Sequence, residues 1–558
     1  MVCMMSESEK PELHIVVLWQ NALDIEKRVI DHIAGDEKLE ILERINIKWT
    51  KGNTKSNYSR FYGIKLSDVR WKMKECGKGD FLMITLIDHN PIYDERKTSR
   101  GVETVNSNIF DLKKLFRKWS GGGHKVHTTN NSSEAEHDLA LLLGVNPADY
   151  LREIGKDAEK NLARTIERDI VGSNGWSNLS YFFYILNSTT EYVVIRNYEY
   201  LPSNYVSENH GDIDIICSDF EELKLIANAK KVFWGKNRVH CSVEIAGERV
   251  LFDFRFIGDE YYCKDWQQRI LCERVLNDGI YVPSETHYFH SLVMHAILHK
   301  FEIAEDYFVT VENLHRNLFP GEEINENPFD GYAMRLFDFL DENGFEITRP
   351  IDSSVVYREH IAEIKRLYTF LGDEVGLNGV IPKLLEPKNG GFFHFSAIDF
   401  DGKRIFIKCG GFGKSAEREY EISRELNTPD DRRFCKALRY ECIGGNKFVI
   451  FQYEDSPTLE SLIQDRVITE KERVRIFKEI KQISKVLLEK KILHRDLRPS
   501  NIMVKKNGDL VVIDFQFSLL IGRNSEMSEI INNPKLIKGL GEEFALSSFS
   551  WDDNHQSR

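Results

Sequence analysis

The segment Lys491–Ser518 limits the fold and the chemistry possible for this chain more than any other part of its sequence. It reads KILHRDLRPSNIMVKKNGDLVVIDFQFS and contains three polar side chains that suit one kind of chemistry, namely Asp496, Asn501 and Asp514. Phosphoryl transfer from ATP needs one carboxylate to orient the attacking hydroxyl, and an amide and a second carboxylate to hold Mg2+. The segment therefore predicts an ATP- and Mg2+-dependent phosphotransferase site, in which Asp496 is catalytic and Asn501 and Asp514 bind the metal.

Further candidate parts of such a site lie upstream. Arg404–Lys408 (RIFIK) predicts a strand that ends in a lysine able to hold the ATP phosphates. The helical segment that follows offers Glu419 as the ion-pair partner of Lys408, with Glu421 as the alternative. We expect the adenine base to contact the three residues after the apolar strand Phe448–Phe451, which are Gln452, Tyr453 and Glu454.

An amphipathic helix is predicted over Glu472–Lys490, because apolar residues recur there at helical spacing. These residues are Ile476, Ile480, Ile483 and Leu487. With this helix in place, residues 375–530 resemble the protein-kinase-like fold. The resemblance implies that Lys408 holds the ATP phosphates and that Asp496 orients the acceptor hydroxyl. The alternative is a pseudokinase, a non-catalytic nucleotide-binding scaffold that keeps the fold without the chemistry.

Three departures from the protein-kinase pattern bear on the acceptor. Gln516 stands where a glycine normally follows the metal-binding Asp-Phe pair, and the glycine-rich loop is reduced to Asn389-Gly390-Gly391. Residues 515–558 contain no Ala-Pro-Glu motif, so we expect a truncated C-terminal lobe. The C-terminal region instead looks like small-molecule and sugar kinases of the bacterial lipopolysaccharide type. This resemblance favours a sugar, polyol or glycan acceptor over a protein.

A second acidic motif lies in the middle of the chain. In HGDIDII, Asp212 and Asp214 are two residues apart on a predicted strand and so point to the same face, where both can reach one divalent ion. A third carboxylate, Asp253, lies on the strand-like run VLFDF. The sequence predicts that the three carboxylates bind Mg2+ and take part in catalysis. The alternative is an acidic turn beside a buried strand.

This middle region resembles the nucleotidyltransferase superfamily, which includes enzymes that transfer phosphocholine or phosphopolyols from CDP carriers. The Gly-Ser pair usual in that superfamily is absent, and Arg196 stands near its place. We expect Arg196 to contact the nucleotide. The resemblance implies a second nucleotide, such as CTP or a CDP-linked donor.

The N-terminal region carries polar residues around two glycine-containing loops, TSRG and GGGHKVH. Arg96 and Arg100 are candidates for a phosphate clamp, and His124 is a candidate acid or base. The alternative is a solvated polar loop. No reaction is assigned to this region.

The chain of 558 residues is too long for one core, and its pattern predicts an α/β and α+β multidomain protein. The predicted parts are an α/β domain of unknown role over 10–155 and a nucleotidyltransferase-like mixed-sheet domain with a helical extension over 170–315. A loop-rich linker over 316–374 and a kinase-like domain over 375–558 follow.

Composition limits the partners and the compartment. The formal net charge of −13 argues against a nucleic-acid binder. No run approaches the ~20 apolar residues that span a bilayer, and the nine cysteines form no CxxC pair. We expect a cytoplasmic protein with a small-molecule or glycan substrate and no transmembrane segment; its oligomeric state is not predicted.

Two phosphotransfer motifs on one chain favour a multifunctional phosphotransferase. We expect the kinase-like domain to phosphorylate a hydroxyl and the middle domain to transfer a nucleotidyl or phospho-substituent group, in bacterial surface polysaccharide biosynthesis. The alternatives are a regulatory or toxin-like enzyme that modifies proteins, and a non-catalytic nucleotide-binding scaffold.

Overall fold

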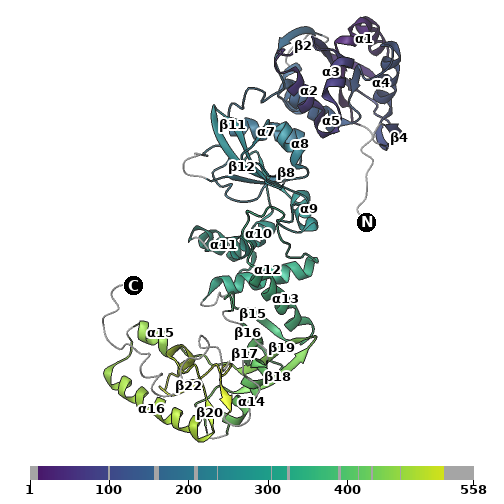
Figure 1. Ribbon diagram of the computed structural model, residues 1–558. Coiled ribbons are helices and arrows are strands. Elements are labelled where there is room, and N and C mark those ends of the chain that lie inside the picture. Colours follow the sequence, from purple (N-terminus) through teal and green to yellow (C-terminus); the bar gives the residue numbers. More distant parts are fainter. Residues whose placement is uncertain are drawn as a thin grey trace. The chain divides into compact units, whose positions relative to one another are not determined.

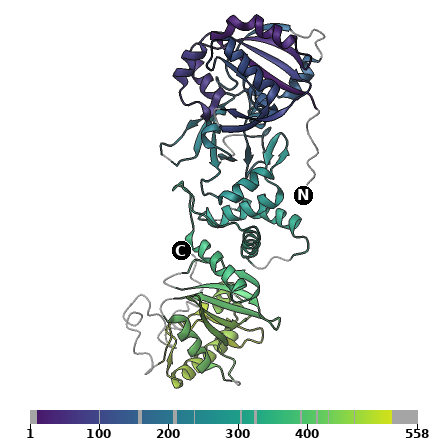
Figure 2. The ribbon, with the colours of Figure 1, turned by 90° about the vertical axis from the view of Figure 1, so that its right-hand side faces the viewer.

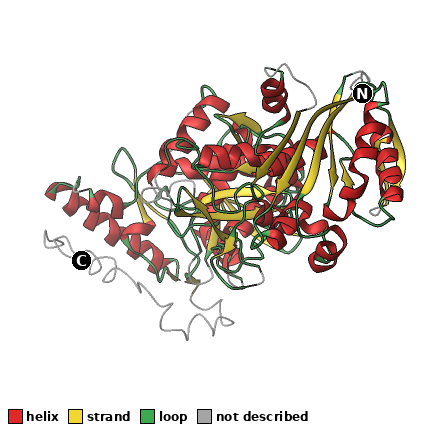
Figure 3. Ribbon diagram, turned by 90° about the horizontal axis from the view of Figure 1, so that it is seen from above, coloured by secondary structure: helices red, strands yellow, loops and turns green. Residues whose placement is uncertain are grey.

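The computed structural model describes residues 10–98, 101–155, 162–205, 211–235, 237–302, 305–322, 327–387, 391–411, 414–428, 431–465 and 467–520 of the chain. These residues form a mixture of helices and strands (Figure 3). They divide into two compact units: Met1–Leu292 with Phe345–Val355, and Val293–Gly344 with Val356–Arg558. Within the described ranges, no helix has the length and apolarity that crossing a membrane requires.

The first unit begins with a five-stranded sheet whose order is β6-β1-β3-β2-β7. Its strands are β1 (Glu12–Leu18), β2 (Leu39–Lys48), β3 (Phe81–Asp88), β6 (Val126–Thr128) and β7 (Leu162–Glu167). The central strand β3 reads FLMITLID and is buried along its whole length, because helices cover both faces of the sheet (Figures 1 and 2). Apolar side chains of α1 (Glu26–Ala34) and α4 (Ser107–Trp119) pack on one face. Those of α2 (Thr54–Tyr62) and α5 (Ser132–Leu143) pack on the other.

A second five-stranded sheet of the same unit has the order β10-β11-β12-β9-β8. Its strands are β8 (Tyr192–Val194), β9 (Ile213–Cys217), β10 (Lys230–Lys231), β11 (His240–Ile245) and β12 (Glu248–Phe256). β9 and β12 run parallel, with Asp214 opposite Asp253, whereas the other pairs are antiparallel. α7 (Leu179–Thr189) and α8 (Phe220–Ile226) contribute buried apolar residues to its core.

The two sheets of the first unit share one hydrophobic core. A single cluster of buried side chains runs from Trp19 in the first sheet region through Phe183 on α7 to Phe252 in the second sheet. Arg60 on α2 reinforces this connection, since its buried guanidinium donates hydrogen bonds to the backbone oxygens of Leu225 (2.9 Å) and Ile226 (2.8 Å) near α8. The N-terminal and middle regions are therefore packed together as one unit.

Helices dominate the start of the second unit. These include α11 (Glu305–Leu318), α12 (Pro328–Asn343) and α13 (Glu359–Asp373), so the segment expected to be a loop-rich linker contains two regular helices. Apolar residues recur in α12 at the helical spacing of 329, 332, 333, 336, 337 and 340, and all of them are buried. The Pro- and Gly-containing sequence before α12 conceals this periodicity. Asp330 ties α12 to the following sheet, because it accepts a hydrogen bond from Leu384 N at 3.1 Å.

The second unit continues with an antiparallel sheet of order β15-β16-β17-β19-β18. Its strands are β15 (Asn378–Pro382), β16 (Phe392–Ile398), β17 (Arg404–Gly410), β18 (Ala437–Ile443) and β19 (Asn446–Gln452). Phe370 on α13 packs its ring 5.9 Å from that of Phe448, on one face of the sheet. α14 (Ser415–Leu426) contributes Ala416 to the cluster on the other face.

A helical lobe follows the sheet. It contains α15 (Leu459–Gln464) and α16 (Glu470–Glu489), and two short antiparallel ladders, β20 (Ile492–Leu493) with β23 (Leu519–Leu520) and β21 (Ile502–Val504) with β22 (Leu510–Val512). α16 starts at a capping box formed by Thr469 and Glu472 and buries the four apolar residues expected from their spacing. The residues after Leu520, on which the expectation of a truncated lobe depends, lie outside the described residues.

Candidate active site

Strand β17 positions the lysine of the C-terminal site. Ile405, Ile407 and Cys409 alternate with Phe406 and Lys408, so the lysine points to the sheet face that carries α14. There Lys408 Nζ donates to Glu419 Oε1 and to Asp514 Oδ1, each at 2.7 Å.

Of the two glutamates considered as its partner on α14, Glu419 is completely buried and contacts the lysine. Glu421 is exposed to solvent. The structure therefore brings together Lys408, Glu419 and Asp514, which are far apart in the sequence.

The three charges of this cluster control one another's protonation. Burial raises the pKa of the Glu419 carboxyl, although the charge of Lys408 opposes this. For Asp514, burial also raises the pKa, but the charge of Lys408 outweighs it and the net pKa is lowered. Burial alone would lower the pKa of Lys408, yet Asp514 and Glu419 raise it above its usual value. Lys408 is thus held as a cation and Asp514 as a carboxylate, the forms that bind phosphate and metal.

The loop after β20 places Asp496 and Asn501 in contact. Asn501 Nδ2 donates to the backbone oxygen of Asp496 at 2.8 Å and to its Oδ2 at 3.0 Å. The amide oxygen of Asn501 is therefore the atom suited to a cation. Arg495 and Asp514 adopt left-handed backbone conformations, with φ of 67° and 68°. Such conformations are costly for residues with a Cβ and are concentrated at functional sites.

His494 joins this loop to the strand that precedes Asp514. Asp496 N donates to His494 Nδ1 at 3.3 Å, so the ring proton lies on Nε2, which donates to Ile513 O at 3.1 Å. Burial lowers the pKa of His494 to about 4, and the imidazole is neutral at physiological pH.

The segment after Asp514 is held against α14. Phe515 N donates to Glu419 Oε1 at 3.2 Å, and Arg418 Nη2 donates to the backbone oxygen of Gln516 at 2.8 Å. Gln516, which replaces the expected glycine, also donates from its side chain to Asp514 Oδ2 at 3.2 Å. This substitution therefore adds a hydrogen bond to the carboxylate predicted to bind metal.

The residues expected to contact adenine lie at and just after the end of β19. Gln452 N donates to Lys436 O at 2.9 Å. The ring of Tyr453 is covered by the guanidinium of Arg404, 4.0 Å from the ring centroid. The carboxylate of Glu454 pairs with Lys505 Nζ at 3.2 Å. In the reduced glycine loop, Asn389 and Gly390 lie outside the described residues, and Gly391 immediately precedes β16.

Comparison with known families classifies this site. Residues 405–536 match the family model described as the protein kinase domain. This part of the chain is a protein kinase domain. The match begins in β17 and covers Lys408, Glu419, Asp496, Asn501 and Asp514. Domains of this family catalyse phosphotransfer, and the match implies the use of ATP and Mg2+ by this part of the chain.

Relatives of the chain are protein kinases by name. It is 26% identical over 149 residues to mitogen-activated protein kinase kinase 7 of Arabidopsis thaliana, covering 27% of this chain and 46% of that protein. It is 25% identical over 258 residues to the probable serine/threonine-protein kinase mkcF of Dictyostelium discoideum, covering 42% of this chain and 36% of that protein. The chain thus spans less than half the length of each of these relatives.

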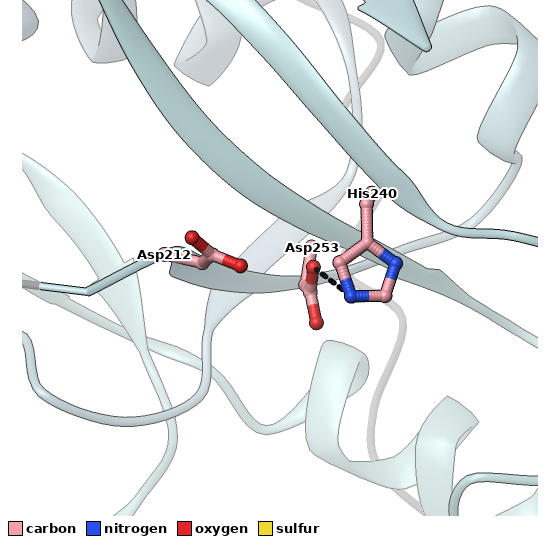
Figure 4. A group of neighbouring side chains, drawn as sticks. All are labelled: Asp212, His240 and Asp253. Atoms are coloured by element: carbon pink, nitrogen blue, oxygen red, sulfur yellow. Dashed lines mark ion pairs between the residues drawn. The ribbon is translucent and has the colours of Figure 1, made fainter. Parts of the chain in front are cut away.

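A second cluster of candidate ligands lies in the other unit, on the sheet that contains β9 and β12. One ligand atom from each of Asp212, His240 and Asp253 lies within 4.8 Å of the other two (Figure 4). His240 Nε2 is 3.4 Å from Asp253 Oδ1, because these residues are paired in register on β11 and β12. The structure therefore brings together two of the three predicted carboxylates and adds an imidazole, that of His240, which no sequence motif indicates.

The third predicted carboxylate, Asp214, is occupied by another partner. Arg196 donates to it from Nε at 2.8 Å and from Nη2 at 2.5 Å, and both side chains are buried. A buried guanidinium needs such a counter-charge. Arg196 also donates to the hydroxyl of Tyr261 at 3.1 Å. Its guanidinium is thus engaged with Asp214 and Tyr261.

The cluster has the electrostatics of a cation site. Burial, and next the neighbouring charge of Asp214, raise the pKa of Asp253 to about 6. The same two causes raise the pKa of Asp212. Asp253 Oδ1 is buried and accepts no hydrogen bond from a described residue, whereas its Oδ2 accepts one from Arg255 Nη2 at 3.4 Å. Two carboxylates and an imidazole fit a divalent cation, and this donor set suits Mn2+ or Zn2+ as well as Mg2+.

The described N-terminal candidates, Arg96 and His124, lie in different segments of the first unit. Arg96 lies on the exposed hairpin of β4 (Tyr93–Thr98) and β5 (Gly101–Asn106), where it pairs with Asp94 at 3.1 Å. Arg100 lies outside the described residues. His124 lines a cavity formed within the first unit.

Proposed function

We propose that the protein is an ATP- and Mg2+-dependent kinase that phosphorylates a hydroxyl group of a sugar, polyol or glycan. The observation that carries the proposal is the convergence of Lys408, Asp496, Asn501 and Asp514 within the kinase domain. A degenerate kinase domain commonly loses at least one of these residues, and here all four are present.

Each residue has a distinct role in this mechanism. Lys408 holds the ATP phosphates and is itself held by Glu419. Bound Mg2+ would neutralise charge on the phosphates, and Asn501 and Asp514 are the residues that would hold it. Asp496 accepts the proton of the acceptor hydroxyl as that oxygen bonds to the γ-phosphorus and the bond to ADP breaks. Asn501 fixes the Asp496 carboxylate through its hydrogen bond to Oδ2.

Two observations bear on the acceptor and point in different directions. Residues 515–558 contain no Ala-Pro-Glu motif, which favours a sugar or glycan over a peptide. The relatives are protein kinases by name, which favours a protein acceptor. We place the sugar, polyol or glycan first because the first observation concerns the sequence of this chain, whereas the second concerns the names of its relatives.

Transfer of the labelled γ-phosphate of ATP decides between these acceptors. The purified chain is incubated with Mg2+ and labelled ATP, once with mixed sugars, polyols and isolated surface glycans, and once with casein and myelin basic protein. Label in the carbohydrate fraction supports the proposal, and label only in protein assigns a protein acceptor instead. Binding of ATP without release of ADP in any mixture would contradict kinase activity. The chain would then be interpreted as a nucleotide-binding scaffold.

A second candidate activity is supported by the cluster of Asp212, His240 and Asp253. We infer that the middle region transfers a nucleotidyl or phospho-substituent group from CTP or a CDP-linked donor, in the assembly of a surface polysaccharide. The pairing of Arg196 with Asp214 leaves Asp212 and Asp253 as its acidic metal ligands. Incubation with labelled CTP or a CDP-linked polyol, Mn2+ and glycans tests this. Release of pyrophosphate or CMP is expected from the wild-type chain and not from Asp253→Asn.

A further inference from the structure

A large cavity lies in the first unit, apart from both clusters already described. Its volume is about 820 Å³, which is within the usual range for a pocket that holds a small organic ligand. Residues of α3 (Val69–Cys76), the β4–β5 hairpin, α4 and the start of α5 line it. Six lysine and arginine side chains are among the lining residues: Lys65, Lys72, Lys97, Lys113, Lys114 and Arg117.

Most of these cations have no protein counter-charge. None of Lys65, Lys72, Lys97, Lys114 and Arg117 forms an ion pair with a residue that the structure describes. Lys72 is only 6% exposed, yet its Nζ contacts a backbone oxygen, His124 O at 3.2 Å, and the face of the Tyr62 ring at 4.2 Å. Arg117 Nε likewise donates to a backbone oxygen, that of Val126 at 3.0 Å. Buried charges are normally paired, so this arrangement favours an anionic ligand.

Asp138 and Asp68, two of the acidic residues that line the cavity, are engaged with other groups. Asp138 Oδ2 contacts His127 Nε2 at 2.6 Å, and Asp138 Oδ1 contacts His137 Nδ1 at 3.1 Å. Asp68 Oδ1 caps α3 by accepting from Arg70 N at 2.8 Å. These carboxylates therefore do not neutralise Lys72 and Arg117.

The cations also repel one another around His124. Burial lowers the pKa of Lys72, and the charge of Arg117 lowers it further. Burial lowers the pKa of His124 as well, followed by the charges of Arg117, Lys72 and Lys113. An anion placed between these side chains would relieve the repulsion, and oxygens of a phosphate group are suited to lysine and arginine.

We propose that this cavity binds a small organic phosphate ester of mononucleotide or sugar-phosphate size. Lys72 and Arg117 contact its phosphate oxygens, and Lys114 adds charge at the edge. Trp71 and Phe110, which also line the cavity, offer apolar surface for the organic part of the ligand. The site lies outside the kinase domain and is independent of the function proposed above.

Calorimetric titration of the full chain tests this site. The probes are AMP and glucose 6-phosphate, with adenosine and glucose as unphosphorylated controls. Lys408→Met is the background for every titration, because it removes the cation proposed to hold nucleotide phosphates in the kinase domain. The test variants are Arg117→Gln and Lys114→Gln, of which the second alters an exposed side chain and therefore tests the site without a risk to folding. Lys118→Gln is the matched control, since Lys118 is an exposed neighbour on α4 that does not line the cavity.

We expect at least one phosphorylated probe to bind about tenfold more tightly than its unphosphorylated control. Arg117→Gln should weaken that binding about tenfold and Lys114→Gln severalfold, whereas Lys118→Gln should leave it unchanged. Tighter binding of AMP would assign a nucleotide, and tighter binding of glucose 6-phosphate a sugar phosphate. The proposal is overturned if neither phosphorylated probe binds at millimolar concentration, or if Arg117→Gln and Lys114→Gln bind as tightly as Lys118→Gln.

Discussion

Lys408 Nζ lies 2.7 Å from Asp514 Oδ1, although 106 positions separate the two residues in the sequence. The contact joins strand β17 of the kinase-domain sheet to the segment that follows β22 in the helical lobe. The groups that would bind phosphate and metal are thereby placed in direct contact. Glu419 holds the same lysine from α14, so three separate elements define this position.

Replacement of Lys408 by methionine should remove most of the phosphotransfer activity. The variant loses the cation that we propose to face the ATP phosphates, and we expect kcat/KM for ATP to fall about 100-fold or more. Lys403→Met is the matched control, because Lys403 lies on the same hairpin and its side chain is 76% exposed. Steady-state ADP release measures both variants. Equal losses in the two would contradict the role of Lys408.

Substitution of Glu419 should lower the phosphotransfer rate far more than substitution of Glu421. Glu419→Gln removes the charge that orients Lys408, so we expect a rate loss of about 10- to 100-fold. Glu421→Gln should retain wild-type activity, because that side chain is exposed on α14. The rate is measured as a function of ATP concentration. The rate loss of Glu419→Gln should appear when ATP is below saturation. A comparable loss in Glu421→Gln would show that the lysine partner is wrongly assigned.

The kinase domain should lose stability in mild acid because of His494. Burial lowers the pKa of His494 to about 4, whereas an unfolded histidine titrates near 6.5. Its contribution is therefore fully present above pH 6.5 and is lost as the pH falls towards 4, by about 2 kcal/mol between pH 7 and pH 5.

Urea unfolding of the full chain, followed by circular dichroism at these two pH values, measures the effect. His494→Gln should reduce the pH dependence of the unfolding free energy, whatever its effect at pH 7. The exposed His89→Gln should retain it. An unchanged pH dependence in His494→Gln would contradict a neutral buried imidazole.

Asp253 should be needed for one of two divalent-cation sites. In an Asp514→Asn background, which removes a proposed metal ligand of the kinase domain, Mn2+ should still bind to the chain with Asp253 intact. Asp253→Asn should weaken this binding about tenfold or more, and Glu248→Gln at the exposed start of β12 should not. Electron paramagnetic resonance of free Mn2+ measures the affinity.

The affinity of this site should also fall as the pH drops below 6. Burial raises the pKa of Asp253 to about 6, and its carboxyl must release the proton before it binds metal. Binding that is the same at pH 5 and pH 7 would contradict the assignment of Asp253 as a ligand.

The kinase residues could be predicted because local sequence fixes most of their geometry. Asp496 and Asn501 belong to one loop, and their contact depends on a few intervening residues. The strand and helix that carry Lys408 and Glu419 have clear patterns of their own. The preference for Glu419 over Glu421 follows from helix periodicity, since only one of two residues that lie two positions apart on a helix can face the sheet.

The cluster of Asp212, His240 and Asp253 was less predictable because it depends on strand register. His240 meets Asp253 only through the pairing of β11 with β12, and the sequence alone does not specify that pairing. Arg196 and Asp214 meet through the neighbouring strands β8 and β9. The cavity of the first unit was still harder to foresee, because its lining comes from several separate helices and a hairpin.

Turnover by Asp496→Asn tests the central claim most directly. Asparagine keeps the size of the side chain but cannot accept the proton of the attacking hydroxyl. Release of ADP with the acceptor that labels best should fall at least about 100-fold, while ATP binding stays unchanged. Asp509→Asn, at an exposed position of the hairpin between β21 and β22, should retain wild-type turnover. Wild-type turnover in Asp496→Asn would contradict the assignment of this site as the catalytic centre.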